Sequence, residues 1–154
     1  MIHFWLLISS ELSYLERKVF SRLLLSLVLF LGLSACSDKQ LFSNLDNNEL
    51  TVMLDKGVPM FDIRRSEEWK QTGVVEGSKK LTFVDKNGRL TPEFLPKFTS
   101  AVGKDEPVIL ICRTGNRTRA LASHLTQELG YTNVHHVKNG ITNWIRDGRS
   151  VVKN

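Results

Sequence analysis

Apolar and polar positions alternate along residues 41–152 in short blocks that predict strands separated by helices. Four apolar runs have the length of buried strands, and they cover residues 58–63, 81–84, 107–112 and 134–137. Five segments carry helix signals, and they cover residues 46–56, 66–71, 91–102, 116–129 and 141–145. Strands that alternate with helices imply right-handed crossovers, so the pattern predicts an α/β domain built on an open parallel sheet.

Particular residues mark where some of these helices should begin and end. Asp46 and Glu49 form an Asp-x-x-Glu signature for a helix start, and Gly57 follows where that helix should stop. Thr91 is predicted to cap a later helix, with Pro92 at its first helical position. The helix over 116–129 has one apolar stripe, formed by Leu121, Leu125 and Leu129.

The N-terminal part of the chain has a different pattern. Residues 23–35 form an uncharged apolar run that follows several bases, and the run is shorter than the about 20 residues that a membrane-spanning helix needs. This arrangement predicts the hydrophobic region of a secretory signal peptide. The run ends in the residues Leu33-Ser34-Ala35-Cys36, which resemble a bacterial lipobox.

The lipobox resemblance implies cleavage before Cys36, a diacylglycerol on its sulfur and acylation of the new N-terminus. Residues 1–35 would then be a lipoprotein signal peptide, 36–40 the lipidated end and tether, and 41–152 the exported domain. Several acyl chains would hold this domain on a bacterial cell-envelope membrane, facing the periplasm or the exterior. The alternative is an ordinary signal peptide or a buried N-terminal helix. Residues 1–18 precede a signal that is complete without them, and they would be absent if translation began at Val19.

Composition narrows the possible functions of the 154-residue chain. There are 21 Lys and Arg residues against 16 Asp and Glu residues, which gives a formal net charge of +5. The bases are scattered without an aromatic-interleaved stripe, so the sequence favours attraction of small anions and predicts no nucleic-acid partner. Two cysteines at distant positions exclude a multi-disulfide scaffold and any CxxC redox or zinc motif.

The second cysteine stands where an α/β sheet usually binds its ligand. Cys112 ends the strand 107–112, which is uncharged and apolar on both faces as expected of a central strand, and residues 113–118 lead into a helix. A tight loop before a helix N-terminus turns backbone N–H groups inward and binds anions. Together with Arg113 and Arg117, these donors should favour the thiolate and make Cys112 a nucleophile.

The other residues of this loop suit an anion site. Gly115 supplies the freedom for a positive φ that a sharp turn requires, and the threonine hydroxyls can donate hydrogen bonds. The predicted substrate-binding residues are Arg113, Thr114, Gly115, Asn116 and Thr118. A buried structural cysteine before an ordinary loop is the alternative.

Three ordered motifs resemble a single-domain rhodanese over about residues 41–151. They are Phe61-Asp62-Ile63-Arg64 followed by Glu67-Glu68-Trp69, the loop Cys112-Arg113-Thr114-Gly115-Asn116-Arg117, and the ending Gly130-Tyr131 with Val134, Val137, Gly140-Ile141 and Trp144. The resemblance implies a rhodanese-like open parallel sheet of five strands with helices on both faces. It also implies that Cys112 carries a sulfane sulfur as a persulfide, while the loop amides and Arg117 hold the anion.

The expected activity is sulfur transfer from a thiosulfate-like donor to cyanide or a thiol acceptor, without a cofactor or a metal. The loop from Cys112 to Arg117 has six residues, the size associated with sulfurtransferases, whereas the related dual-specificity phosphatases use one more. The alternative is a lipid-anchored persulfide carrier or protein-docking module without turnover, whose protein partner the sequence does not identify. A thiol oxidoreductase is a weaker choice, because the mature chain would lack a resolving cysteine.

Other polar residues have simpler interpretations. Asp62 and Arg64 are predicted to form an internal ion pair at the end of the sheet. Glu67 and Glu68 open a helix, where acids favour the dipole, so neither is predicted to be catalytic. His135 and His136 are adjacent on a strand, so their side chains should point to opposite faces and share no metal. His124 is expected at the surface. Trp69 and Trp144 are expected in or beside the core.

Overall fold

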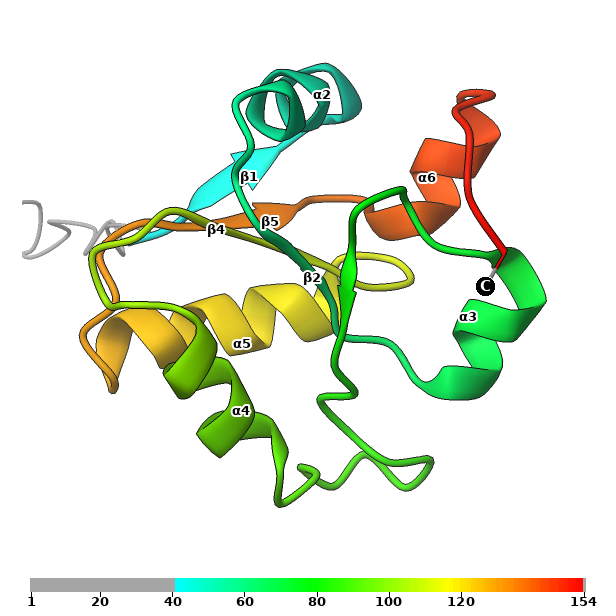
Figure 1. Cartoon of the computed structure of the whole chain (residues 1–154). Coiled ribbons are helices and arrows are strands. Elements are labelled where there is room, and N and C mark those ends of the chain that lie inside the picture. Colours follow the sequence, from blue (N-terminus) through cyan, green and yellow to red (C-terminus); the bar gives the residue numbers. More distant parts are fainter. Residues whose placement is uncertain (1–40, 154) are drawn as a thin grey trace, which may run out of the picture. The chain divides into compact units, whose positions relative to one another are not determined.

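Five parallel strands form a single sheet at the centre of the computed structural model, which describes residues 41–153 (Figure 1). Their bounds are Ser43–Leu45 for β1, Met60–Asp62 for β2, Lys79–Lys80 for β3, Val108–Ile111 for β4 and Val134–Val137 for β5. The strand order is β1-β5-β4-β2-β3, and every neighbouring pair is parallel. The predicted open parallel sheet is confirmed.

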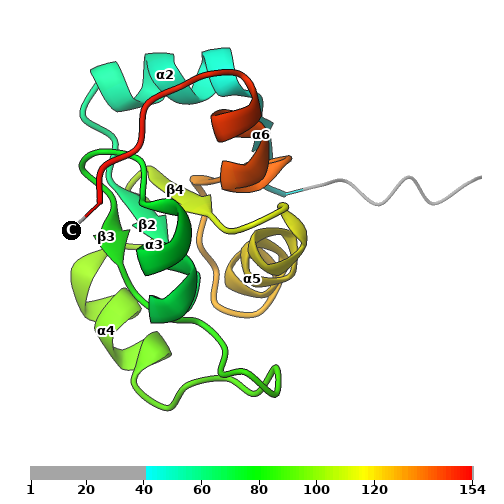
Figure 2. The same cartoon turned by 90° about the vertical axis from the view of Figure 1, so that its right-hand side faces the viewer.

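Helices cover both faces of this sheet. Their bounds are Asn47–Asp55 for α2, Ser66–Thr72 for α3, Phe94–Ala101 for α4, Asn116–Gln127 for α5 and Gly140–Arg146 for α6. Figures 1 and 2 show α2 and α6 on one side of the sheet and α4 and α5 on the other. Among the described residues, no helix is long and apolar enough to cross a bilayer.

The central strand β4 explains why the core has two layers. Its residues Val108 and Leu110 pack with Phe94 and Phe98 of α4, whereas Ile109 and Ile111 face the other side. That second layer is completed from the elements around it by Leu45, Leu50, Met60, Val137, Ile141 and Trp144. Because successive side chains of a strand point to opposite faces, a strand covered by helices on both sides must be apolar at every position.

The predicted helix start at Asp46 is confirmed as a complete capping box. The Asp46 carboxylate accepts hydrogen bonds from the backbone N–H groups of Asn48 at 2.8 Å and Glu49 at 2.9 Å. In return, Glu49 accepts from the Asp46 N–H at 2.8 Å. Gly57, which follows the helix, has φ of +75°.

Two predicted elements differ in the structure, and one strand was not predicted. The strand expected over 81–84 lies earlier, at β3, because only Lys79 and Lys80 form a continuous ladder with β2. After Lys80 the chain makes only isolated hydrogen bonds to the end of β2, such as the one from the Leu81 N–H to the Asp62 carbonyl at 3.1 Å. The helix expected from Thr91 begins at Phe94. β1 is short and acquires its strand conformation by pairing with β5.

Thr91 does not cap α4, because its hydroxyl is engaged elsewhere. It donates a hydrogen bond to the carbonyl of Thr82 at 2.5 Å, and its backbone N–H donates to the carbonyl of Phe83 at 3.0 Å. These bonds hold Thr91 against the edge segment that follows β3. The N-cap position of α4 is therefore taken by Glu93, whose side chain makes no capping hydrogen bond.

The predicted ion pair between Asp62 and Arg64 is confirmed, and it is buried. Arg64 Nη2 lies 2.6 Å from Asp62 Oδ2, and the exposed fractions of the two side chains are 1% and 0%. The same guanidinium donates to Thr72 Oγ1 and to the carbonyl of Gly73, both at 2.7 Å. One buried cation thus fastens the end of β2 to the last turn of α3.

Removal of this cation should destabilise the domain strongly. Arg64→Gln should lower the free energy of unfolding by about 3 to 5 kcal/mol, because it leaves the Asp62 carboxylate buried without its charged partner. Arg89→Gln is the matched control: it breaks the exposed ion pair between Arg89 and Asp85, which should change the stability far less because solvent screens an exposed pair. Urea denaturation measures both, and equal losses would contradict a structural role for the buried pair.

Residues 1–40, which include the predicted signal peptide and Cys36, lie outside the described part of the chain.

Candidate active site

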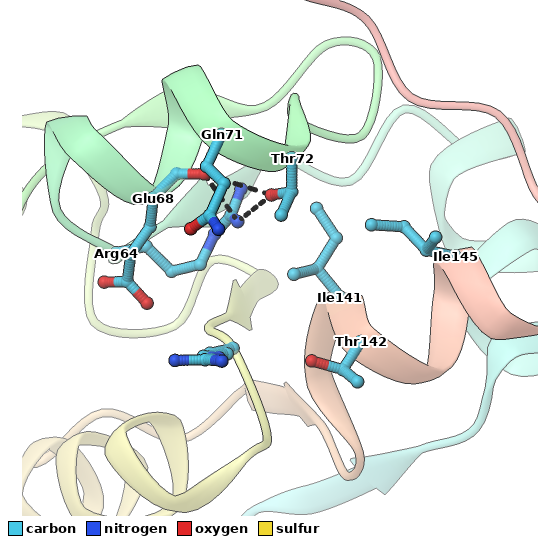
Figure 3. A pocket seen from close by; sticks show the side chains of 8 residues that line it. Arg64, Glu68, Gln71, Thr72, Ile141, Thr142 and Ile145 are labelled. Carbon is cyan, nitrogen blue, oxygen red and sulfur yellow. Dashed lines mark hydrogen bonds between the residues drawn. The ribbon is translucent and has the colours of Figure 1, made fainter.

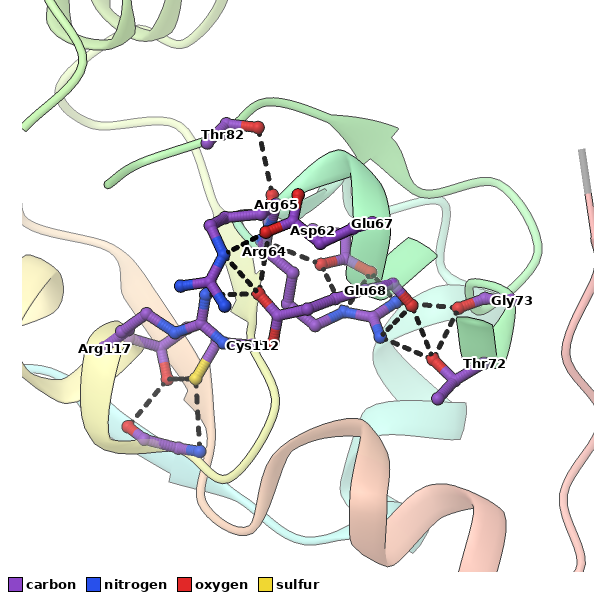
Figure 4. A network of polar contacts seen from close by, with 12 residues as sticks. Asp62, Arg64, Arg65, Glu67, Glu68, Thr72, Gly73, Thr82, Cys112 and Arg117 are labelled. Carbon is purple, nitrogen blue, oxygen red and sulfur yellow. Dashed lines mark hydrogen bonds and ion pairs between the residues drawn. The ribbon is translucent and has the colours of Figure 1, made fainter. Parts of the chain in front are cut away.

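Cys112 lies between the end of β4 and the start of α5, as the sequence predicts. Its side chain is almost fully buried, with an exposed fraction of 1% for the residue. The backbone N–H of Gly115 donates a hydrogen bond to Cys112 Sγ at 3.2 Å, and the Thr118 hydroxyl oxygen lies 3.7 Å from the same sulfur. Figure 4 shows this sulfur beside Arg117. The loop therefore curls around the thiol and presents a backbone hydrogen-bond donor to it.

Gly115 is required by the loop for two reasons. Its φ of +91° lies in the left-handed region that favours glycine. In addition, a Cβ at this position would lie 1.9 Å from the carbonyl oxygen of Lys138, which follows β5. The predicted need for backbone freedom is confirmed, and the close contact with Lys138 adds a packing reason that the sequence alone does not show.

The backbone of the loop is fixed by the first residues of α6. Ile141 N–H donates to the carbonyl of Cys112 at 2.8 Å, and Thr142 N–H donates to the carbonyl of Arg113 at 3.1 Å. In a trans peptide the C=O and N–H groups point in opposite directions, and the described residues contain no cis peptide bond. The N–H groups of Arg113 and Thr114 consequently point away from α6, where they are available to an anion.

Arg117 is held by a carboxylate that the sequence analysis did not place in the site. Its Nη1 and Nη2 atoms donate to the two carboxylate oxygens of Glu68, at 2.8 Å and 2.6 Å (Figure 4). Glu68 lies in the first turn of α3 and is largely buried. Planar, bidentate pairs of this kind are among the stronger hydrogen-bonded ion pairs. Glu68 therefore positions Arg117 at the loop, in addition to opening its helix.

The charges of this pair stabilise each other. Burial, the largest influence, would raise the pKa of Glu68, but hydrogen bonds from Arg117 and from the Arg65 backbone outweigh it and lower the pKa to about 2. The hydrogen bonds to Glu68 in turn raise the pKa of Arg117. A smaller upward contribution to the pKa of Arg117 comes from Cys112, whose sulfur lies beside the guanidinium (Figure 4).

The remaining predicted loop residues fall into two groups. Thr118 is fully buried, and its hydroxyl donates a hydrogen bond to the carbonyl of Gly115 at 2.9 Å. This bond ties the loop to the first turn of α5. Arg113, Thr114 and Asn116 have exposed side chains at the surface of the loop. The structure therefore gathers Cys112, Gly115, Arg117 and Thr118 around the sulfur and leaves the other three at the rim.

A second residue missed by sequence reasoning is His136 of β5. It is fully buried, its Nδ1 lies 3.2 Å from Thr118 Oγ1, and its Nε2 is hydrogen-bonded to Asn44 Oδ1. As predicted, His135 faces the opposite side, where it contacts Asn133. A row of close polar contacts thus leads from the thiol through Thr118 and His136 to β1.

His136 is neutral at neutral pH, because burial and, less strongly, the charge of Arg119 lower its pKa to about 4. His124 is exposed on α5, as expected. Within residues 41–153, no three His, Cys, Asp or Glu side chains form a group that could hold a metal ion.

Protonation of His136 should lower the free energy of unfolding as the pH falls. The pKa is about 4 in the folded chain against an ordinary value of 6.5, so the unfolded chain binds the proton first as the pH falls. This group's contribution to stability is complete above pH 6.5 and is lost between pH 6.5 and 4, by up to about 3 kcal/mol. The contribution of Glu68 to stability can be distinguished from that of His136, because it is lost at lower pH, between pH 4.5 and 2.

Urea denaturation at pH 7 and at pH 4 tests this coupling in the wild type and in His136→Gln. The wild type should lose more stability between the two pH values than the variant, and His124→Gln, at an exposed position, should behave as the wild type does. An identical pH dependence in wild type and His136→Gln would show that His136 does not titrate in this window.

Comparisons with known proteins agree with this geometry. The family model "Rhodanese-like domain" matches residues 46–147. The thiosulfate sulfurtransferase GlpE of Tolumonas auensis is 36% identical over 55 residues, which are 36% of this chain and 51% of that protein, so the match spans about half of that relative's length. A sulfurtransferase of Allochromatium vinosum is 28% identical over 112 residues, 71% of this chain and 94% of that protein.

The fold is also similar to that of solved structures. A rhodanese-related protein from Thermoplasma volcanium superposes with a TM-score of 0.56 at 23% identity, and the match covers 73% of this chain and 99% of that one. At this level of identity the likeness concerns the fold.

Proposed function

Because the chain belongs to the rhodanese-like domain family, we propose that it is a sulfurtransferase in which Cys112 carries a sulfane sulfur as a persulfide. The observation that carries the proposal is the position of Cys112 Sγ inside a short loop, 3.2 Å from the Gly115 N–H. Both relatives described above are named as sulfurtransferases, which supports the same class of reaction.

The proposed reaction has two half-reactions that balance without an external oxidant or reductant. The Cys112 thiolate attacks the outer sulfur of a thiosulfate-like donor, the S–S bond of the donor breaks, and sulfite leaves with the bonding electron pair. The acceptor, cyanide or a thiolate, then attacks the outer sulfur of the persulfide. The Cys112 thiolate leaves, and thiocyanate or a new persulfide is released. This is covalent catalysis with ping-pong order.

The neighbouring groups provide what each half-reaction requires. The Gly115 N–H and the N-terminus of α5 stabilise negative charge on the sulfur before attack and after transfer. The Arg113 and Thr114 N–H groups, which point away from α6, are suited to bind the sulfonate oxygens of the donor. Burial of the sulfur protects the persulfide from other thiols until an acceptor enters.

Loop size supports sulfur transfer over phosphate hydrolysis. Four residues separate Cys112 from Arg117, and the backbone of this loop is held by both Gly115 and the first turn of α6. A ring of this size closes around a single sulfur atom, whereas a phosphate group requires a wider cradle. Because Gly115 lies in contact with Lys138, the loop has little room to widen.

Persulfide formation can be measured directly by intact mass. In Cys36→Ser protein, Cys112 is the single thiol of the chain. Thiosulfate should add the mass of one sulfur atom, cyanide should remove it, and protein that also carries Cys112→Ser should show neither change. Thiosulfate:cyanide transfer should exceed aryl-phosphate hydrolysis by orders of magnitude.

Two results would contradict the proposal in different ways. Cyanide-labile sulfur on Cys112→Ser protein would exclude Cys112 as the nucleophile. Cys112-dependent phosphatase activity without sulfur transfer would replace the proposed reaction. Loading that is discharged only to a protein partner would instead identify the carrier function.

We also propose that the domain is held on a bacterial cell-envelope membrane by lipid on Cys36. The support is the sequence Leu33-Ser34-Ala35-Cys36 after an uncharged apolar run. Expressed in a bacterium with lipoprotein processing, the wild type should take up labelled palmitate and sediment with membranes. Cys36→Ser should take up no label, and the matched Cys112→Ser should be labelled as the wild type is. A wild type that stays unlabelled and wholly soluble would overturn the anchor.

A further inference from the structure

A cavity of about 280 Å³ lies between α3 and α6, beside the loop that contains Cys112. In Figure 3, Thr72 of α3 lies opposite Ile141 of α6 across this space, and Gln71 and Ile145 also belong to the lining. Arg113, from the loop, completes the lining together with the ends of Arg64 and Glu68. The cavity thus combines an apolar side with polar and charged groups, which is typical of sites for small organic ligands.

Two connections place the cavity next to the nucleophile. Arg113 follows Cys112 directly, and Ile141, which lines the cavity, donates its N–H to the Cys112 carbonyl at 2.8 Å. Glu68 lines the cavity and also holds Arg117 at the loop. The outer sulfur of a persulfide would stand about 2 Å beyond Sγ. The cavity therefore adjoins the loop that holds the sulfur, although Cys112 itself does not line it.

The charges around the cavity do not cancel. Arg64 is neutralised by its buried pair with Asp62. Glu68 is neutralised by its bidentate pair with Arg117. Arg113 is exposed and, among residues 41–153, forms no ion pair. The positive charge of Arg113 is therefore not neutralised, and it favours a ligand with an anionic group.

The apolar side of the cavity indicates whether the cavity suits the sulfur donor or the sulfur acceptor. Ile145 is 39% exposed, although it is a large hydrophobic residue, and Ile141 beside it forms part of the core. A ligand with a short aliphatic stem would cover Ile145 and remove apolar surface from water. Thiosulfate has no such stem and is polar on every side. The lining therefore suits an acceptor better than it suits the sulfur donor.

We propose that this cavity binds the sulfur acceptor, and that the acceptor is an aliphatic thiol that carries a carboxylate. The carboxylate binds Arg113, the stem lies on Ile145, and the thiolate reaches the outer persulfide sulfur. The thiolate attacks that sulfur, the S–S bond to Cys112 breaks, and the Cys112 thiolate leaves with the electron pair. The acceptor's proton is lost to water beforehand. This inference rests on the proposed sulfurtransferase function and specifies its second substrate.

The test compares acceptors that differ in charge. Full-length Cys36→Ser protein is loaded with thiosulfate, freed of excess donor, and mixed with 3-mercaptopropionate or with 2-mercaptoethanol. Intact mass gives the rate of sulfur loss from Cys112 for each thiol. The ratio of the two rate constants is then compared between protein variants, so that the intrinsic nucleophilicity of each thiol cancels.

Arg113→Gln should lower the ratio for 3-mercaptopropionate over 2-mercaptoethanol about tenfold, because a charge-assisted contact to the carboxylate is lost. Arg113→Glu should lower it further and favour cysteamine, a cationic thiol of similar size. Ile145→Asp should lower the ratio as well, since it removes the apolar side and repels the carboxylate. Lys138→Gln is the matched control, because it removes a positive charge from an exposed residue whose backbone contacts the loop and which does not line the cavity.

The outcomes separate the acceptor site from the reaction itself. Normal loading with the same ratio in Arg113→Gln as in the wild type would overturn the acceptor site alone. An equal fall of the ratio in Lys138→Gln would also overturn it, because the preference would then arise from the general positive field. Failure of the wild type to take up sulfur from any sulfane donor would overturn the proposed function, and the acceptor site with it.

Discussion

The candidate site depends on a close contact between two stretches of backbone that are far apart in the sequence. The loop after β4 packs against the segment that joins β5 to α6, and both sides of the contact are glycines. A Cβ on Gly140 would lie 2.4 Å from the Cys112 carbonyl oxygen, and a Cβ on Gly115 would collide with Lys138. Because this contact turns the loop carbonyls toward α6, the N–H groups remain for the sulfur and its ligands. The parallel sheet makes the contact possible, since β4 and β5 are neighbours whose carboxyl ends meet at one edge.

A buried network of charges connects this loop to the rest of the domain. Arg64 fastens β2 to the end of α3, and Glu68 from the first turn of the same helix reaches Arg117 on α5 (Figure 4). Helix α3 therefore has little freedom to move independently of the loop. Each buried charge in this network has an opposite charge as its neighbour, which is the condition under which buried ions are tolerated.

The sequence predicted those parts of the fold that follow from local patterns. β4 could be predicted because burial on both faces requires an unbroken apolar run, and the capping box at Asp46 because its partners lie three residues apart. β1 and β3 could not, since neither has a pattern of its own and each is a strand only through pairing with a neighbour. The same limit applies to the site. Cys112 and its loop are contiguous, whereas Glu68 is 49 positions from Arg117 and could have paired with any of several bases. His136 could be assigned to one face of β5, but its contact with Thr118 depends on how α5 lies on the sheet.

The bidentate pair between Glu68 and Arg117 has a consequence for how tightly the site can hold an anion. Both Nη atoms of the guanidinium already have a carboxylate as partner, at 2.6 Å and 2.8 Å. Glu68 takes one N–H of each Nη atom, so an incoming sulfur oxyanion meets the remaining N–H groups of a guanidinium whose charge is already neutralised. The anion therefore gains less from Arg117 than it would from an unpaired cation, which keeps its affinity low. A domain that has to release an anion in every cycle would gain from this arrangement, because product would leave as readily as substrate arrives.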